Sequence, residues 1–216
     1  LASSAASDVY KRQALYKARE NGKEIIAYTS GLGTTNYLIA SQANEVILEK
    51  DAYGSVLPFG FSRVRQYQKD FFENIKVDMN VYAAGDFKSG PEGFTRNDMS
   101  ETDRLAWVEF ITPVWEKYKA MMEKGRGFDS GTIQYIGDNY HLLATENGGD
   151  DNETALATGL VDKLMTKQEI RNYMIEKFGS EEDYEWPEGI TGREYLSTLE
   201  DLSLIHISEP TRHRQI

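Results

Sequence analysis

One lysine, Lys88, stands where its side chain could act as a base. It follows a stretch from Val77 to Ala83 in which apolar residues alternate with polar or amphipathic ones. That period of two predicts a strand with one face in a core. Residues 89–94 then contain two glycines and a proline, which predict a stiff turn. Because burial disfavours a charged ammonium, a lysine held at the end of a buried strand could be neutral and act as a general base.

The simpler interpretation of Lys88 is a solvated surface charge, as for most lysines. The catalytic interpretation requires that Lys88 lie on a concave surface near the edge of the sheet. It also requires that the ammonium have no tight carboxylate partner. Asp86 and Glu92 are the nearby carboxylates in the sequence, and on a strand-like path Asp86 would point to the same side as Lys88.

Few other catalytic chemistries are open to this chain. It has no cysteine, and two of its three histidines, His206 and His213, lie near the carboxyl end. With only His141 elsewhere, a Ser-His-Asp triad, a Cys-His dyad and a Cys/His zinc site are nearly excluded. The sequence predicts no metal and no cofactor, because the glycines at 31 and 33 complete neither a Walker nor a dinucleotide-binding pattern. The net charge of −11 argues against a nucleic-acid partner.

The segments that would position Lys88 alternate between strand and helix. Short apolar runs predict strands at 24–29 and 45–49 and an extended segment at 54–61. Helical patterns at 34–43 and 65–76 lie between these strands and the strand before Lys88. This order predicts a largely parallel sheet with covering helices.

A long helix is predicted from Ser100, where Asp103 three residues later is typical of a capping box. Pro113 inside it predicts a kink or a division, and glycines at 125 and 127 predict its end. Its apolar side chains recur every three or four residues and predict one face packed in the core: Leu105, Val108, Thr112, Trp115, Tyr118 and Met122.

Three further elements follow this helix. The sequence predicts a short helix ending at Thr158, with Gly159 as its cap, and a brief buried strand at 160–162. Thr166 with Glu169 predicts the start of an amphipathic helix that ends at Gly179.

The residues around Lys88 resemble a known family motif. Phe87-Lys-Ser-Gly-Pro-Glu-Gly-Phe94, with Asp98-Met-Ser100 after it, resembles the Tyr-Lys-Ser-Ala-x-Glu-Pro-Phe…Asp-Met-Ser segment of the signal peptide peptidases, or protease IV family. The chain departs from that segment at Gly90 and Gly93, where the family usually has alanine and proline. The resemblance extends to Tyr37-Leu-Ile-Ala-Ser-Gln-Ala-Asn44 and Gly159-Leu-Val-Asp162, and it covers residues 14–201.

The resemblance implies an α/β fold of the crotonase or Clp-protease type, a spiral of ββα units truncated on the amino-terminal side. It implies that Lys88 is the general base of a serine–lysine dyad. It also implies that the chain is the amino-terminal repeat of a two-repeat protein whose serine lies in the second repeat. The position corresponding to that serine is Thr34, which could be a nucleophile but which the start of its helix predicts to be an N-cap.

The function implied by the resemblance is a membrane-associated serine endopeptidase that degrades cleaved signal peptides. Its partners would be apolar peptides, the second repeat and further copies of itself, and a missing anchor would hold it at the periplasmic side of a bacterial inner membrane. One alternative is a non-catalytic crotonase-fold module for assembly or binding, and a weaker one is an acyl-CoA enzyme. The sequence contains no run of about 18 apolar residues that could span a membrane.

Both ends of the sequence resemble translated sequencing adapters, at residues 3–13 and 202–212. We therefore expect residues 1–13 and 202–216 to be artefactual and residues 14–201 to be a partial peptidase repeat.

Overall fold

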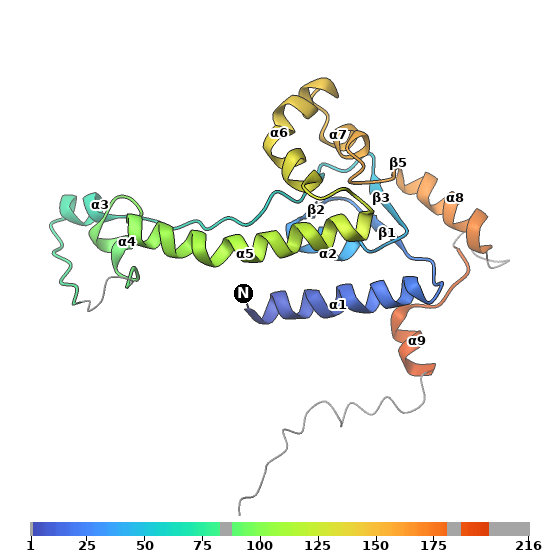
Figure 1. The fold of residues 1–216 in the computed structure, drawn as a ribbon, viewed down its shortest axis with the longest axis horizontal. Coiled ribbons are helices and arrows are strands. Elements are labelled where there is room, and N and C mark those ends of the chain that lie inside the picture. Colours follow the sequence, from blue (N-terminus) through green and yellow to red (C-terminus); the bar gives the residue numbers. More distant parts are fainter. Residues whose placement is uncertain (1, 83–87, 181–186, 199–216) are drawn as a thin grey trace, which may run out of the picture. The chain divides into compact units, whose positions relative to one another are not determined.

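The computed structural model describes residues 2–82, 88–180 and 187–198. The chain forms two units, residues 1–166 and residues 167–216. The first unit contains all the named strands of the described chain (Figure 1). The second contains α8 (Lys167–Phe178), α9 (Gly192–Thr198) and an isolated antiparallel bridge between Ser180 and Pro187.

The strands form two small parallel sheets. β1 (Ile26–Thr29), β3 (Glu45–Glu49) and β5 (Lys163–Met165) form one sheet in the order β1-β3-β5. β2 (Leu32–Gly33) and β4 (Val56–Leu57) form the other. Along the chain β1 and β2 are followed by α2 (Thr34–Ala40), and then by β3 and β4, which is a ββα order. The first strand of each pair joins one sheet and the second strand joins the other. The predicted α/β class with parallel strands and covering helices is confirmed.

Helices make up the rest of the first unit. α3 (Lys69–Asn74) and α4 (Glu92–Thr95) are short, and α5 (Glu101–Arg126) is the longest described helix. α6 (Thr132–Glu146) and α7 (Asp151–Ala157) follow it. The sequence reasoning missed α6. Pro113 does not divide α5, because it lies on an exposed part of the helix where water can reach the carbonyl that proline leaves without its intrahelical partner.

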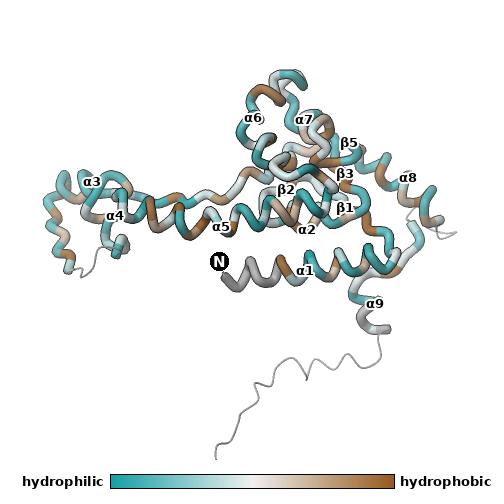
Figure 2. The backbone as a smooth tube through the Cα atoms, viewed as in Figure 1, coloured by the Kyte–Doolittle hydropathy of each residue, from teal (hydrophilic) through white to brown (hydrophobic). Residues whose placement is uncertain are grey.

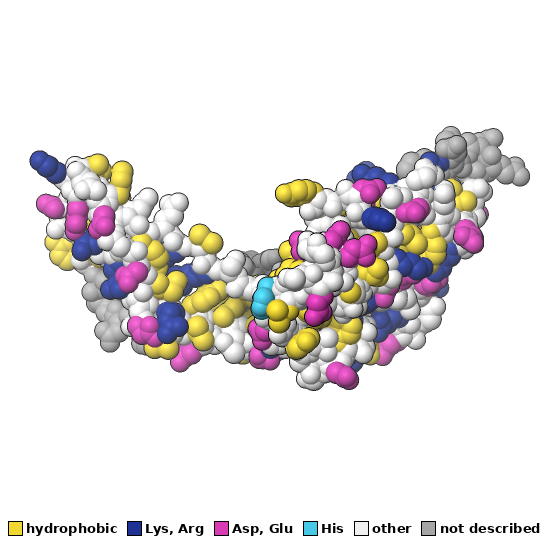
Figure 3. Space-filling view, turned by 90° about the horizontal axis from the view of Figure 1, so that it is seen from above, with side chains coloured by type: hydrophobic (Ala, Val, Ile, Leu, Met, Phe, Trp, Pro, Cys, Tyr) yellow, Lys and Arg dark blue, Asp and Glu magenta, His cyan; other side chains and the backbone are white. Residues whose placement is uncertain are grey.

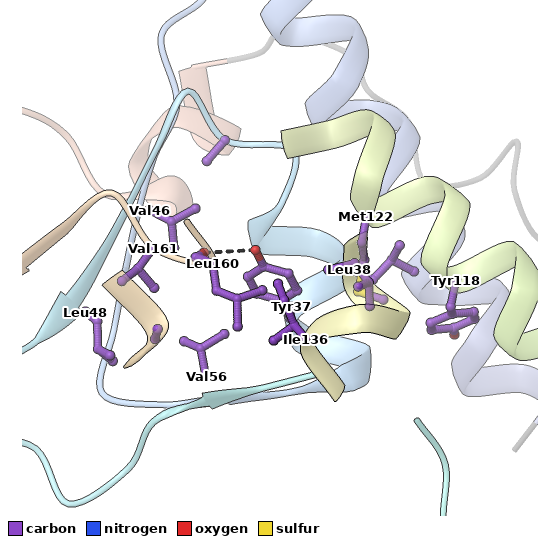
Figure 4. Close-up of a cluster of buried hydrophobic side chains, with 13 residues drawn as sticks. Tyr37, Leu38, Val46, Leu48, Val56, Tyr118, Met122, Ile136, Leu160 and Val161 are labelled. Atoms are coloured by element: carbon purple, nitrogen blue, oxygen red, sulfur yellow. Dashed lines mark hydrogen bonds between the residues drawn. The ribbon is translucent and has the colours of Figure 1, made fainter. Parts of the chain in front are cut away.

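The core lies between the strands and the carboxyl-terminal half of α5. Tyr37 and Leu38 of α2, Val46 and Leu48 of β3, and Met122 of α5 are all fully buried (Figure 4). The Tyr37 hydroxyl donates a hydrogen bond of 2.8 Å to the carbonyl of Leu160, so this buried aromatic side chain is not left with an unsatisfied polar atom. Hydrophobic segments of the chain are prominent around β1, β3 and β5 in Figure 2.

Helix α1 (Ala2–Glu20) reaches this core region through Arg19. The Arg19 guanidinium donates to the carbonyls of Gln42, Ala43 and Gly125, at 3.2, 3.4 and 3.1 Å. These carbonyls follow the end of α2 or lie in the last turn of α5, where helices leave backbone acceptors without intrahelical donors. One cation therefore joins three helices.

The predicted strand before Lys88 is wrong for the described residues 77–82. This segment has no regular structure, and Val77, Met79 and Val81 are each about 40% exposed. The alternation of apolar side chains is present, but a strand also needs a neighbour for its backbone groups. Residues 83–87, including Ala83 and Asp86, lie outside the described residues.

The predicted strand at 160–162 is displaced, because the ladder of β5 begins at Lys163. Leu160 and Val161 are buried as expected. Asp162 is bound through its side chain instead: its carboxylate accepts from the Val46 amide at 2.7 Å and from the Arg126 guanidinium at 2.7 and 2.8 Å. The buried segment is therefore tied to α5 and β3 before strand pairing starts.

The apolar stripe of α5 is only half in the core. Tyr118 and Met122 are buried, whereas Leu105 and Val108 are 51% and 45% exposed. At about 1.5 Å per residue, Asp103 at the start of α5 lies about 22 Å along the helix axis from Tyr118. The prediction of a fully packed stripe is therefore wrong for the first half of the helix.

Candidate active site

Lys88 lies just before α4 and is exposed. It does not follow a buried strand, and its turn is held against the first turn of α5 and not against the edge of a sheet. The prediction that this chain buries Lys88 is therefore wrong. Asp86 and Glu92 are the two nearby carboxylates that could pair with Lys88, and Asp86 lies outside the described residues. Glu92 is occupied elsewhere, since it accepts from the amide and hydroxyl of Ser100 at 3.2 and 2.5 Å. No carboxylate in the described ranges forms an ion pair with Lys88.

The turn after Lys88 is fixed by side chains from two distant segments. The Ser89 hydroxyl donates to Asp103 of α5 at 2.7 Å. The Arg65 guanidinium donates to the carbonyl of Ser89 and, at 2.6 Å, to that of Gly90. The two residues that follow Lys88 are therefore held through one hydroxyl and two carbonyls.

The start of α5 forms only half of the predicted capping box, because the Ser100 amide donates to Glu92 and not to Asp103. Ser100 is the N-cap, and its hydroxyl accepts from the Asp103 amide at 3.1 Å. The same hydroxyl donates to Glu92 of α4, so the short helix after the Lys88 turn is attached to the same helix start. Capping interactions of this kind satisfy amides that have no intrahelical acceptor.

Asp103 is a buried carboxylate, 7% exposed, with two arginines as partners. Arg63 and Arg65 donate to its two oxygens at 3.1 and 3.3 Å. Burial by itself would raise the pKa of Asp103, but the hydrogen bonds from Ser89 and Arg63 and the two positive charges outweigh it, so the pKa lies below its usual range.

Thr34 is not the N-cap that its pattern predicted. Gly33 is the N-cap of α2, and Thr34 is the first helical residue, 8% exposed. Its hydroxyl donates to the carbonyl of Gly60 at 2.7 Å and accepts from the Gly60 amide at 3.1 Å. The side chain is used to attach a neighbouring loop and not to cap the helix.

Apolar side chains surround the α3–α4 region at the surface. Figure 3 shows hydrophobic side chains among charged ones at the left, where α3, α4 and the first half of α5 lie in Figure 1. An open hollow of about 460 Å³ is lined by Phe72, Val77, Met79 and Phe94 together with polar neighbours. The exposed members of this apolar surface are Phe71, Ile75, Val77, Met79, Val81, Tyr82, Phe94, Leu105, Val108 and Phe110.

A second hollow, of about 600 Å³, lies at the turns around β2 and β4. Gly31 and Gly54 meet there, and a Cβ at Gly54 would be 2.5 Å from the carbonyl oxygen of Ser30. These glycines allow two turns to approach closely, which is a packing role. Lys88 lines neither hollow.

Sequence reasoning found Lys88 but missed the residues that hold it. Arg63 and Arg65 alternate in a segment without regular structure, and two residues at that spacing can point to the same side of an extended chain. That spacing was a usable signal for a carboxylate partner. Asp103 was recognised only as part of a helix cap, and its own ion pairs were not predicted.

Comparisons with known proteins cover most of the chain. The model of the family described as peptidase family S49 matches residues 17–179. Protease 4 of Salmonella typhi is 30% identical over 174 residues, which are 79% of this chain and 27% of that protein. Protease 4 of Haemophilus influenzae is 28% identical over 194 residues, 90% of this chain and 31% of that protein. The chain thus spans less than a third of the length of either relative.

These matches confirm the resemblance to the protease IV, or signal peptide peptidase, family that was drawn from the motif around Lys88. Both relatives are bacterial. In the described part of the chain, no helix combines the length and the hydrophobicity needed to cross a membrane. The family model covers well over half of the 216 residues, and the chain therefore belongs to peptidase family S49.

Proposed function

We propose that this chain supplies the general base, Lys88, of a serine–lysine peptidase whose nucleophilic serine lies in a second repeat outside the chain. The observation that carries the proposal is the position of Lys88 in a family motif, on a turn held at Ser89 and Gly90, within a chain of family S49. Its neutral Nζ would take the proton of the serine hydroxyl as the oxygen attacks a peptide carbonyl. The resulting ammonium would then protonate the leaving amine.

The exposure of Lys88 supports a site that is completed by another segment. A lysine in water remains an ammonium, so a base at this position needs a covering surface that removes water. The second repeat is the proposed cover. The exposed apolar side chains near α3 and α4 support the same arrangement, because patches of this kind are typical of interaction surfaces.

The environment of Thr34 supports the proposal that the base and the nucleophile lie in different repeats. A nucleophilic hydroxyl must be accessible and must give its proton to a base. The Thr34 hydroxyl is buried and already donates that proton to the Gly60 carbonyl at 2.7 Å. Lys88 lies elsewhere in the first unit, next to Ser89, whose hydroxyl donates to Asp103 at the start of α5. We therefore assign the base and not the nucleophile to this chain.

The substrates proposed for the complete protein are apolar extended peptides such as cleaved signal peptides, processed at the periplasmic side of a bacterial inner membrane by an anchored homo-oligomer. The open hollow beside α3 has four apolar side chains in its lining, Phe72, Val77, Met79 and Phe94, which could contact the side chains of such peptides. A non-catalytic binding or assembly module is the second candidate, and the exposed apolar surface around α3 and α5 is the observation that favours it.

The test uses the complete two-repeat protein and an apolar peptide ester. Lys88→Ala should abolish turnover and leave the thermal midpoint almost unchanged, because substitutions at exposed positions usually alter stability by less than about 0.5 kcal/mol. Lys88→Arg should not restore turnover, since a guanidinium does not lose its proton in a protein. Near-normal turnover of Lys88→Arg would overturn the proposal.

The chain by itself gives the companion experiment. It should not hydrolyse the ester, because it holds no assigned nucleophile. Hydrolysis by the chain alone, abolished by Thr34→Ala, would instead assign the nucleophile to Thr34.

A further inference from the structure

Asp103 is unusual among the carboxylates of the described chain. An acidic residue in the first turn of a helix is stabilised there by the helix dipole, and it can have this benefit while fully exposed. Asp103 is instead 7% exposed, and it lies on the half of α5 where Leu105 and Val108 are not packed in the core. Burying a carboxylate is costly unless its oxygens are hydrogen-bonded. A role at the helix start alone does not account for this burial.

The partners of Asp103 come from outside α5. Arg63 and Arg65 reach it from the segment between β4 and α3, and Ser89 reaches it from the turn after Lys88. Arg65 makes a second set of contacts with that turn, through the carbonyls of Ser89 and Gly90. Asp103 and Arg65 thus bind each other and both bind Ser89, and Arg65 also binds the carbonyl of Gly90.

This arrangement closes a loop of contacts around the residue next to Lys88. The Ser89 hydroxyl donates a hydrogen bond to Asp103, the Ser89 carbonyl accepts one from Arg65, and Arg65 also donates one to Asp103. Apart from these contacts, the Ser89 carbonyl accepts from the Glu92 amide at 3.0 Å, while Lys88 is exposed and a Cβ at Gly90 would meet no atom within 4 Å. One carboxylate and one guanidinium therefore hold the backbone next to Lys88 at Ser89 and Gly90, together with the amide of Glu92.

We propose that Asp103 is a positioning residue for Lys88, acting through Ser89 with Arg65 as its counter-ion, and this inference rests on the proposed function of Lys88. Asp103 touches neither substrate nor Lys88. It fixes the turn from which the lysine must reach a serine hydroxyl, at a hydrogen-bond distance of about 2.6–3.2 Å. A misplacement of about 1 Å can cost about 100-fold in rate.

The first test is made on this chain and is independent of catalysis. Asp103→Asn keeps the size of the side chain but removes the charge that holds two arginines. ¹⁵N relaxation should show lower order at the amides of Ser89 and Gly90. The matched control is Asp162→Asn, which breaks a similar Arg–Asp pair at the other end of α5. It should leave the order at Ser89 and Gly90 unchanged. Unchanged order in Asp103→Asn would overturn the inference.

The second test is made on the complete protein. Asp103→Asn should lower kcat by about 10- to 100-fold and change KM by less than about twofold, because a misplaced base affects the chemical step more than substrate binding. Ser89→Ala, a milder change, should lower kcat by a smaller factor. The double variant should lose no more than Asp103→Asn alone, since both changes break one connection. The Asp162→Asn control should keep its kcat.

The outcomes separate this inference from the proposed function. Activity in Lys88→Ala would reject Lys88 as the base and the inference with it. If Lys88→Ala is inactive but Asp103→Asn retains the wild-type kcat, only the positioning role is rejected. Equal loss of kcat in Asp103→Asn and Asp162→Asn would show a general effect of stability and would also reject it.

Discussion

Gly125 in the last turn of α5 gives a sharp test of how this helix packs on α2. A Cβ at Gly125 would lie 2.4 Å from the carbonyl oxygen of Ser41 and 2.4 Å from Nε2 of Gln42. Ordinary contacts begin near 3.4 Å, so Gly125→Ala would require the helices to separate by about 1 Å. Ser41 and Gln42 are fully buried, and the Ser41 oxygen belongs to the backbone, so neither can move aside at low cost.

Two effects of opposite sign decide the outcome of Gly125→Ala. Alanine is favoured over glycine in a helix by about 1 kcal/mol. Overpacking typically costs about 1–3 kcal/mol, and the amide of Gln42 would also lose hydrogen bonds to the Ser41 hydroxyl and the carbonyls of Leu38 and Met121. Since the steric and hydrogen-bond costs together exceed the helix preference, we expect a net loss of about 2 kcal/mol. For a chain of this size that corresponds to a fall of about 4–8 °C in the thermal midpoint.

Gly137 provides the matched control, because it also lies inside a helix, α6, but has space around it. A Cβ there would meet only Phe59, at 3.8 Å, which is an ordinary contact. Gly137→Ala should therefore raise the midpoint by about 2–4 °C through helix preference alone. Urea and thermal unfolding, followed by circular dichroism, measure both variants. A stabilising Gly125→Ala would show that α2 and α5 do not pack as closely as described.

Two further substitutions test the hydrogen bonds of the core. Tyr37→Phe removes the donor to the buried carbonyl of Leu160 and should lower the free energy of unfolding by about 1–3 kcal/mol in urea titrations, whereas an unchanged urea midpoint would mean that this bond contributes nothing. Asp162 is affected by burial, which raises its pKa, but hydrogen bonds from Arg126 and Val46 outweigh this, so its pKa lies below the usual value near 3.9. Its contribution to stability is present above that usual value and is lost as the pH falls through the lowered pKa. The urea midpoint of the wild type should therefore fall from pH 5 towards pH 3. Asp162→Asn should be less stable at pH 7, and its urea midpoint should fall less steeply with pH. Equal slopes of urea midpoint against pH in the two proteins would reject this prediction.

Much of the first unit followed from local sequence. β3 was predicted at its observed bounds, β1 within two residues, and the start of α5 at its observed cap, because each depends on neighbouring residues. The motif around Lys88 and the family were also recognised from the sequence. By contrast, α6 was missed, although the apolar residues Ile133 and Ile136, at helical spacing, are buried.

Local sequence could not predict which other segment each patterned segment pairs with or packs against. The alternation at 77–81 predicted a strand, but strand formation depends on a neighbouring strand that this segment does not have among the described residues. The stripe on α5 predicted burial along its length, but only Tyr118 and Met122 are buried in the core, with Trp115 packed against it. Thr34 had the composition of a cap, but the Gly60 loop, 26 residues later, takes both bonds of its hydroxyl.

The two ends of α5 therefore serve different purposes. Its carboxyl-terminal half packs through Tyr118 and Met122 and is joined to Asp162 by Arg126, which stabilises the first unit. Its first turn contributes Asp103, whose contacts with Arg63, Arg65 and Ser89 include no member of the core cluster. Substitutions in the core should then change the amount of folded protein, while substitutions around Asp103 change the position of Lys88. Because about 22 Å of continuous helix separates Asp103 from Tyr118, the two effects can be measured independently on one chain.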